Sequence, residues 1–464
     1  MTVTAPWRNA SSTAFALLNG SIEIGSWVIM LPSIEREFDA TKTAIAWVIV
    51  AFALGLAGAG LAAGRLADLV GLKRTALVTF AAEIALLAGI VVAPELWMLY
   101  PLRFLQGVAR AGSTNAIAAL LIGGFPPGRR GRVLGVRYAL VYGGQMLGAL
   151  FAGQATQAWG WRAAVAGIAA VTVAHTLLLT RHARNDTAKR EAVVAILRRF
   201  DWPGAAAFFV SIGIFIFSIQ LLRGGTEWWG VACLLVAAAI LALAIRIERT
   251  ASTPALDLKL FRNARFTAAT ASLMIMSVGT GTANFLFPFY MQQGLGWSPG
   301  VSGAVYVAMN MSQMLASPLM GGITDRFGAR RLVVAGAAVV VLAFVAGSML
   351  RAGVSQWQVA AVMLAIGAGM VTFETPNNTV IFNNAGPTLG SASAITGVYR
   401  YVGLSLGGAV GATLITVVGG GDVILGFQRG MLVLAAIIAI GLSLAIGVQL
   451  AADRRRAAAA AGPG

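Results

Sequence analysis

The chain contains Gly64-Arg65-Leu66-Ala67-Asp68-Leu69-Val70-Gly71-Leu72-Lys73-Arg74 and, 257 residues later, Gly321-Gly322-Ile323-Thr324-Asp325-Arg326-Phe327-Gly328-Ala329-Arg330-Arg331. In both stretches a glycine is followed four residues later by an aspartate, three residues after that by a second glycine, and then by basic residues. Each stretch follows a long apolar segment. Two copies at equivalent positions indicate an internally duplicated chain, an arrangement that is common in membrane transporters.

Both stretches have the composition of a hinge between helices. Glycine permits a tight turn and close approach of helices, and an aspartate at a helix end can pair with arginine or accept backbone N–H bonds. Such a contact can form in one conformation and break in another, whereas an ordinary basic turn is the simpler alternative. We predict a conformational motif that consists of Gly64, Asp68, Gly71, Arg74, Gly321, Asp325, Gly328 and Arg330.

The rest of the chain is too apolar to enclose itself in a water-soluble surface. Of its 464 residues, 58% are hydrophobic and only 11% are charged, and the mean hydropathy is +0.80. Soluble domains carry about 25% charged residues. The composition therefore excludes a soluble globular enzyme and indicates a protein that is embedded in the lipid bilayer.

Apolar segments bounded by charged residues, proline or glycine predict an all-α membrane protein with fourteen transmembrane helices. The first apolar segment is about as long as a membrane span and lacks the features of a cleavable signal peptide, so we expect it to remain as the first span. The predicted spans are 13–32, 44–63, 75–94, 100–122, 133–155, 162–180, 204–222, 229–246, 267–290, 300–321, 331–350, 357–381, 391–418 and 427–450.

The basic residues predict the orientation of these spans. The net charge is +17, and most of the 34 lysines and arginines fall in alternate loops. Cytoplasmic loops carry such an excess of basic residues, so both termini are expected in the cytoplasm of a multi-pass protein of the inner (plasma) membrane. The same distribution argues against a nucleic-acid partner.

The spans divide the chain into four parts. We predict an N-terminal six-helix bundle over 1–180, a charged cytoplasmic linker over 181–203, two additional transmembrane helices over 204–250, and a C-terminal six-helix bundle with a cytoplasmic tail over 251–464.

On these residues the chain resembles the major facilitator superfamily, specifically its fourteen-span drug:proton antiporter group. The doubled loop motif is the strongest match. Further matches are Arg103 with Gln106 and Gly107 in the fourth span, and Glu23 ahead of the Leu31-Pro32 pair in the first span. The resemblance implies a major facilitator fold of two six-helix bundles around a central cavity, with two extra helices between them. It also implies proton-coupled export of amphipathic drugs or other small lipophilic molecules by alternating access.

Two positions depart from the pattern of this group. Glu23 stands where the group usually has aspartate. In the fifth span Gly144, Gly148 and Gly153 match the antiporter motif, but Ala149 replaces the expected proline. Proline kinks a helix, so this replacement leaves both the kink and the direction of transport open.

Three of the 17 acidic residues lie well inside apolar spans, namely Glu23, Glu83 and Glu374. Ionisable groups inside a membrane mark functional sites by default, and burial favours the protonated form of a carboxylate. We predict proton coupling by Glu23 and Glu374, and the resemblance adds Arg103. The alternative for these acids is a structural ion pair with an arginine of a span. A Glu23 that is locked by a guanidinium group without access to water would contradict its coupling role.

Aromatic and polar side chains near these acids are the predicted substrate contacts. They suit lipophilic or cationic substrates through apolar burial and cation–π contact, although helix packing is the simpler explanation for the aromatic residues. Arg400 has two possible partners, an anionic substrate group or Glu374. The predicted substrate-binding residues are Trp27, Phe285, Phe289, Tyr290, Asn377, Arg400 and Tyr401.

Other classes of protein lack support in the sequence. No phosphate-binding Gly-x-x-x-x-Gly-Lys-Ser/Thr loop occurs, which argues against an ATP-driven pump. With one cysteine and two histidines, no metal site and no cofactor are expected, and a membrane-embedded enzyme is a distant alternative. A lipid translocator or metabolite carrier of the same fold is the nearer alternative, because one fold hosts many functions. The expected partners are a small-molecule substrate, protons and the lipid bilayer, with the protein as a monomer.

Overall fold

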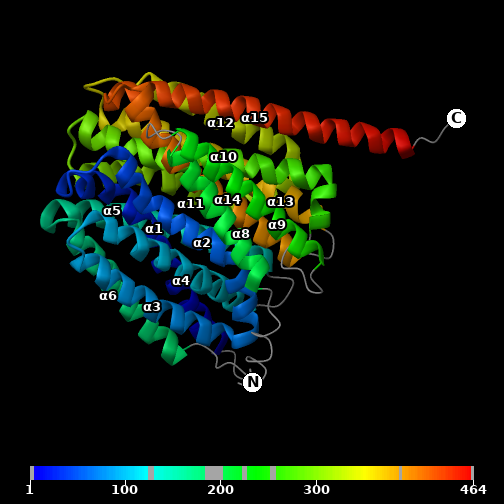
Figure 1. Ribbon diagram of the computed structural model, residues 1–464, viewed down its shortest axis with the longest axis horizontal. Helices are drawn as coiled ribbons and strands as arrows, with labels where there is room; N and C mark the ends of the chain where they lie inside the picture. Colours follow the sequence, from blue (N-terminus) through cyan, green and yellow to red (C-terminus); the bar gives the residue numbers. More distant parts are fainter. Residues whose placement is uncertain are drawn as a thin grey trace.

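The computed structural model describes residues 5–123, 130–182, 202–221, 227–250, 258–385 and 389–460. Within these ranges the chain forms long helices that run side by side (Figure 1). The helices of the first half are α1 (Ala5–Glu37), α2 (Lys42–Val70), α3 (Leu72–Val92), α4 (Leu96–Gly123), α5 (Arg130–Trp159) and α6 (Trp161–His182). The two that follow are α8 (Trp202–Leu221) and α9 (Glu227–Thr250).

The second half repeats this pattern of six helices. Its long helices are accompanied by a short 3-10 helix, η2 (Leu258–Arg262), and by two π-helical segments, η3 (Tyr290–Gly294) and η4 (Leu414–Val418). Those long helices are α10 (Ala264–Phe289), α11 (Pro299–Phe327), α12 (Ala329–Ser348), α13 (Gln356–Asn383), α14 (Leu389–Thr413) and α15 (Val423–Ala460).

The predicted all-helical fold is confirmed, because the described residues contain fourteen long α-helices and no strand. Nine of these helices are long and apolar enough to cross a membrane. The other five are α4, α5, α8, α10 and α11. Of these, α4 carries the buried charges Arg103 and Arg110, and α10 and α11 are rich in glycine, serine and threonine. The fourteen-span arrangement therefore stays a prediction.

Helices α1 and α5 pack with backbone in direct contact, and the second half repeats the contact. A Cβ atom added at Gly148 would collide with the carbonyl oxygen of Ile22, and one at Gly144 would meet the carbonyl oxygen of Leu18. In the second half, a Cβ at Gly407 would collide with the carbonyl oxygen of Val278 on α10. Small residues allow such close approach of membrane helices, so the duplication seen in the loops extends to the helix packing.

The glycines of the two repeated loops form equivalent turns. Gly71 separates α2 from α3 with φ 108°, and Gly328 separates α11 from α12 with φ 83°. The N–H of Gly71 donates to the carbonyl of Ala67, and that of Gly328 donates to the carbonyl of Thr324. Residues with a side chain rarely adopt such positive φ values, so these two turns require glycine.

This requirement predicts opposite effects for two substitutions in the second loop. A Cβ atom added at Gly328 or at Gly321 would meet open space, but Gly321 lies within helix α11. We expect Gly328→Ala to destabilise the protein by about 1–3 kcal/mol because of its positive φ. Gly321→Ala should stabilise it by about 1 kcal/mol because alanine favours helix. Thermal unfolding in detergent checks both, and equal melting temperatures for the two variants would contradict the assignment.

The two halves meet along α5 and α11 and along α2 and α14. Gly153 of α5 and Gly303 of α11 face each other so closely that a side chain on either would collide with the opposite helix. Helices α8 and α9 pack on each other, and Phe215 of α8 contacts the cluster formed by Val50 and Leu54 of α2. Most of the predicted linker, residues 183–201, lies outside the described residues.

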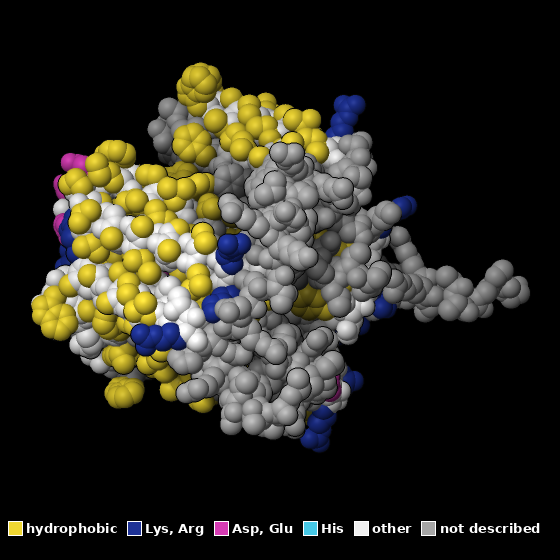
Figure 2. Space-filling view, turned by 90° about the horizontal axis from the view of Figure 1, so that it is seen from below, with side chains coloured by type: hydrophobic (Ala, Val, Ile, Leu, Met, Phe, Trp, Pro, Cys, Tyr) yellow, Lys and Arg dark blue, Asp and Glu magenta, His cyan; other side chains and the backbone are white. Residues whose placement is uncertain are grey.

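The outer face of the helices is apolar. Figure 2 shows hydrophobic side chains spread over one face of the molecule. Exposed residues on the surface include Trp97 on α4, Leu342 on α12 and Leu444 on α15. An apolar surface of this extent belongs in lipid, so the chain is a membrane-embedded protein. The start of α1 and the end of α15 lie at the same end of the bundle (Figure 1).

Candidate functional site

Four charged side chains meet in the interior of the first half. They are Glu23 on α1, Glu83 on α3, and Arg103 and Arg110 on α4, and all four are buried. Arg103 Nη1 lies 3.2 Å from Glu23 Oε1, Arg110 pairs with the other oxygen of Glu23, and Arg110 Nη2 lies 3.2 Å from Glu83 Oε2. Each guanidinium group is thus paired with a carboxyl group, which is the condition for burying ions in an apolar interior.

Arg103 joins three helices of the first half. Its guanidinium carbon lies 4.0 Å from the ring centroid of Trp27 on α1 and 4.2 Å from that of Phe52 on α2. Its Nε donates to the carbonyl oxygen of Val48 at 3.2 Å, and its Nη1 donates to Gln106 Oε1 at 2.6 Å. These contacts match the alternative derived from the sequence, in which the fourth-span arginine is a structural ion pair.

Glu23 is fully satisfied by its neighbours. Oε1 accepts hydrogen bonds from Arg103 and from Gln106 Nε2 at 2.7 Å, and Oε2 accepts from Arg110. The side chain has no appreciable exposure. This conformation therefore meets the condition that argues against proton exchange at Glu23, and the coupling role of this residue stays a prediction.

A second charged site joins the two halves. Glu374 on α13 pairs with Arg400 on α14, and the hydroxyl of Tyr142 on α5 donates to Glu374 Oε2 at 3.0 Å. The side chains of Glu374 and Arg400 are 14% and 28% exposed. Arg400 thus takes the carboxylate partner that the sequence left open. Because Tyr142 belongs to the first half, a change in the charge of Glu374 acts directly on a contact between the halves.

The aromatic residues at the end of α10 are packed in the interior. Phe285, Phe289 and Tyr290 have no exposed surface. The rings of Phe285 and Phe289 lie 4.7 Å apart, and Tyr290 stacks on Phe427 of α15 at 4.0 Å between centroids. This arrangement favours helix packing, the simpler alternative from the sequence, and their contact with a substrate stays a prediction.

The other predicted substrate contacts are divided between the halves. Trp27 is buried beneath Arg103, and its indole N–H has no hydrogen-bond partner among the described residues. Asn377 is buried and donates from Nδ2 to the carbonyl of Ala269 at 2.9 Å. Tyr401 on α14 is half-buried against the apolar cluster around Phe52 of the first half. Of these side chains, Tyr401 alone joins Arg400 at the boundary between the halves.

Polar contacts also close the boundary at the end where α1 and α10 terminate. Lys42 at the start of α2 donates to Glu35 of α1 and to Gln293 of η3. Gln292 Nε2 donates to the carbonyl of Ile29 at 2.9 Å. These bonds tie the second half to the first, so the structure is closed at this end.

The fifth-span glycines all serve close packing. Gly144 and Gly148 face α1, and Gly153 faces α11. Ala149 is buried, and α5 is one uninterrupted helix from Arg130 to Trp159. The helix is therefore continuous at the position where the resemblance implies a proline, and its glycines make their close contacts without one.

The charged residues of the repeated loops lie at the molecular surface where they are described. Arg74, Asp325 and Arg330 are exposed, and Asp325 has no ion-pair partner among the described residues. The side chain of Asp68 is outside the described part of the chain. The glycine turns of the predicted motif are therefore seen here, whereas the switching role of its aspartates stays a prediction.

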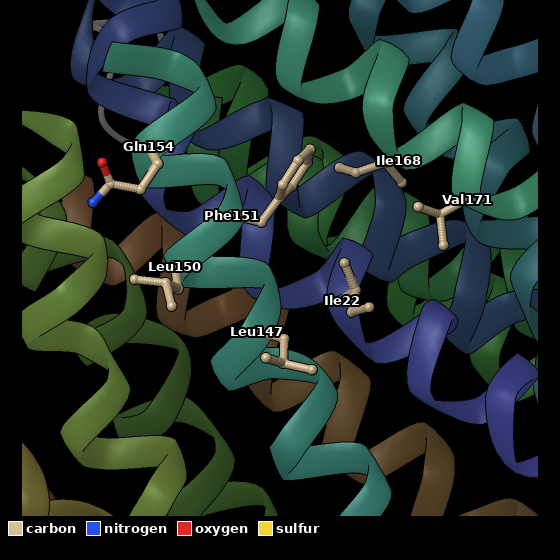
Figure 3. Close-up of a pocket in the computed structure, with 7 residues that line it drawn as sticks. All are labelled: Ile22, Leu147, Leu150, Phe151, Gln154, Ile168 and Val171. Carbon is tan, nitrogen blue, oxygen red and sulfur yellow. The ribbon is translucent and has the colours of Figure 1, made fainter. Parts of the chain in front are cut away.

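An apolar groove of about 310 Å³ lies between α1, α5 and α6 (Figure 3). Its lining contains no ionisable side chain, so it provides apolar contact and no proton chemistry. The lining residues are Ile22, Leu147, Leu150, Phe151, Gln154, Ile168 and Val171.

Several residues of these sites escaped the sequence analysis. Arg110 was not among the predicted site residues, but it lies buried between Glu23 and Glu83. Tyr142 was not selected at all. Its position next to the fifth-span glycines is a usable signal, because glycines at a helix interface place the adjacent side chains near the facing half. Lys42 was not among the predicted site residues either.

Two helical halves related by a repeat, buried in lipid and joined at their boundary by the hydrogen bond from Tyr142 to the ion-paired Glu374, define a polytopic membrane transporter. The chain belongs to the Major Facilitator Superfamily, which its sequence matches over residues 11–408 and 269–462.

Several relatives are named for drug resistance or export. The chain is 27% identical over 397 residues to the multidrug resistance protein Stp of Mycobacterium tuberculosis. The aligned region covers 82% of this chain and 71% of that protein. It is 25% identical over 422 residues to the tetracenomycin C resistance and export protein of Streptomyces glaucescens, covering 89% of this chain and 76% of that protein.

A solved structure described as a proton dependent oligopeptide transporter has the same fold. It superimposes with a TM-score of 0.70 and 15% sequence identity, covering 96% of this chain and 98% of that chain. At this level of identity the likeness concerns the fold alone.

Proposed function

We propose that this protein is a proton-coupled secondary active exporter of small amphipathic molecules that works by alternating access. Its relatives Stp and the tetracenomycin C exporter are named for drug resistance and export, which supports the same class of cargo here. The proposed setting is the inner (plasma) membrane, with both termini in the cytoplasm, fourteen spans and a monomeric protein. The division into two bundles with two inserted helices belongs to the same proposal.

The observation that carries the proposal is the Glu374 site. An ionised Glu374 holds Arg400, and the hydroxyl of Tyr142 reaches it from the other half. A proton on Glu374 removes the charge that binds Arg400, and it changes the bond that joins the halves. Because the two side chains retain some exposure, a proton or a charged substrate has access to this pair. Proton binding and movement of the halves are thereby linked at one carboxylate.

The pair also relates substrate charge to proton movement. A cationic substrate competes with Arg400 and with the proton for Glu374, and this competition is the requirement for exchange of substrate against protons. An anionic substrate binds Arg400 only after Glu374 is neutralised, and it would then travel with the proton. Export in exchange for protons therefore favours cationic or neutral amphipathic cargo. Glu23 and Arg103 enter the proposal as an ion pair in the interior of the first half.

Transport in proteoliposomes tests this function. When a pH gradient is imposed, a lipophilic cationic dye should move opposite to the protons, and a protonophore that collapses the gradient should stop it. ATP should have no effect. Dye movement that is equally fast with and without the gradient would contradict proton coupling.

The cargo is tested by a thermal-shift screen of dyes, antibiotics, lipids and metabolites. A ligand that binds only the folded protein raises its apparent stability, by about 2.7 kcal/mol at a concentration 100 times Kd. Stabilisation by dyes and antibiotics is the expected result. Stabilisation by lipids or by metabolites alone would replace the drug-export assignment with a lipid translocator or metabolite carrier.

A further inference from the structure

Glu83 on α3 is a buried acid that the proposed function does not use. Its Oε1 accepts a hydrogen bond from the hydroxyl of Ser113 at 2.9 Å. Its Oε2 lies 3.2 Å from Arg110 Nη2 but accepts no hydrogen bond among the described residues. The side chain is completely buried. One carboxylate oxygen is therefore near a positive charge without being bonded to it.

Glu23, the neighbouring acid, is bound differently. Both of its oxygens accept hydrogen bonds, from Arg103 and Gln106 on one side and from Arg110 on the other. A buried carboxylate keeps its charge when it is paired and hydrogen-bonded, and it tends to take up a proton when it is not. Of the two acids, Glu83 is the one whose free oxygen has room for a proton.

Among the described side chains, the other ionisable groups around Glu83 lie on helices α4, α1, α6 and α14. They are Arg103 and Arg110 on α4, Glu23 on α1 and His175 on α6, with Tyr401 of α14 near Arg110. The ring of His175 meets that of Phe80, one helical turn before Glu83, at 4.3 Å between centroids. It forms no hydrogen bond to Glu83. Arg110 is therefore the single cation within ion-pair distance of Glu83 in the described structure.

We propose that Glu83 is the side chain of the first half that takes up and releases a proton, while Glu23 stays an ionised partner of Arg103 and Arg110. This inference rests on the proposed proton-coupled transport. While Glu83 is ionised, Arg110 is shared between α3 and α1. When a proton binds Glu83 Oε2, the attraction of Glu83 for Arg110 is lost, and Arg110 is held by Glu23 alone.

The consequence is a switch between helices. Proton uptake weakens the link between α3 and α4 and strengthens the link between α4 and α1. Glu83 thus positions Arg110, and through Arg110 it positions α1 relative to α4. The arrangement also gives Arg110 a carboxylate partner in both protonation states, so that neither state leaves a guanidinium group unpaired in the interior.

Infrared spectroscopy of the full-length protein in lipid nanodiscs tests this assignment without substrate or gradient. Spectra recorded between about pH 5 and about pH 9 report the C=O absorption of protonated carboxyl groups. A component that titrates in the wild type should be absent from Glu83→Gln. The same component should persist in Glu374→Gln, which removes the acid that carries the proposed function, and in Glu95→Gln, which changes an exposed acid.

A Glu83→Gln spectrum that still contains every titrating component of the wild type would overturn the assignment, as would a wild type with none. If Glu83→Gln does not fold, Glu83→Asp provides the second measurement. Its shorter side chain moves the carboxylate away from Arg110, so the titration midpoint should shift by about one pH unit or more. An unchanged midpoint would count against Glu83.

The spectroscopic result is independent of transport. If a Glu83 component titrates but dye movement ignores the pH gradient, the proposed function fails and the proton site remains. If transport follows the gradient but Glu83→Gln leaves the spectrum unchanged, the proposed function stands and the assignment of Glu83 fails.

Discussion

Glu374→Gln is expected to lower gradient-driven dye transport by about 100-fold or more, the scale on which loss of an essential proton-transfer group slows an enzyme reaction. Glutamine keeps the size of the side chain but cannot exchange a proton. It also removes the charge that pairs with Arg400, while its amide can still accept the hydrogen bond from Tyr142. Uptake of dye into proteoliposomes under an imposed pH gradient measures the effect.

Cooperative unfolding and ligand binding distinguish the loss of transport from misfolding. The neutral side chain mimics the protonated state, so Glu374→Gln protein should still unfold cooperatively and bind a neutral amphipathic ligand in a thermal-shift assay. Glu374→Asp, which keeps an exchangeable carboxylate, should retain part of the transport. Glu95→Gln, at an exposed acid, should transport like the wild type. Full gradient-driven transport by Glu374→Gln would exclude Glu374 from the coupling mechanism.

The fold follows from properties that are local in the sequence. A span must be apolar for the thickness of the bilayer, so each apolar segment marks a helix, as for the predicted span 133–155 and the observed α5 (Arg130–Trp159). The observed helices extend beyond the apolar segments because polar residues continue the helix outside the hydrocarbon region. α15 (Val423–Ala460) is the clearest case, against a predicted span of 427–450.

The two glycine turns of the repeated loops could also be predicted from the sequence. Glycine is needed where φ is positive, and the glycines at positions 71 and 328 occupy the same place in the two repeats. The pattern alone thus predicted where two pairs of helices turn. The contact between Gly148 and α1 was not derivable in the same way, because it depends on which helices are neighbours.

Partners within the charged sites could not be predicted, for the same reason. Helices that are apolar on all sides give no periodic signal of the direction in which a buried side chain points. The sequence therefore identified Glu23, Glu83 and Glu374 as membrane-embedded acids without showing that Arg110 lies between the first two. It likewise offered Arg400 two partners, and the packing of α13 against α14 selected Glu374.

Arg103→Ala is expected to have the largest effect on stability, a loss of about 3–5 kcal/mol, because it removes one partner of a buried ion pair. The substitution leaves Glu23 with one guanidinium partner, and it removes the cation that lies between the rings of Trp27 and Phe52. The hydrogen bond to the carbonyl of Val48 is also lost, so α1, α2 and α4 lose a common contact. Thermal unfolding of the purified protein in detergent measures the effect.

Two further variants show whether charge or geometry matters at Arg103. Arg103→Lys keeps the charge but lacks the planar group that bonds in several directions and stacks on aromatic rings, so it should recover only part of the lost stability. Arg351→Ala, at an exposed arginine, should unfold like the wild type. If Arg103 served proton transfer alone, Arg103→Ala would unfold at the temperature of the wild type and fail only in transport. A lower melting temperature of Arg103→Ala would identify Arg103 as an ion-paired clamp of the first half. Proton exchange would then belong to acids whose oxygens accept fewer hydrogen bonds than those of Glu23.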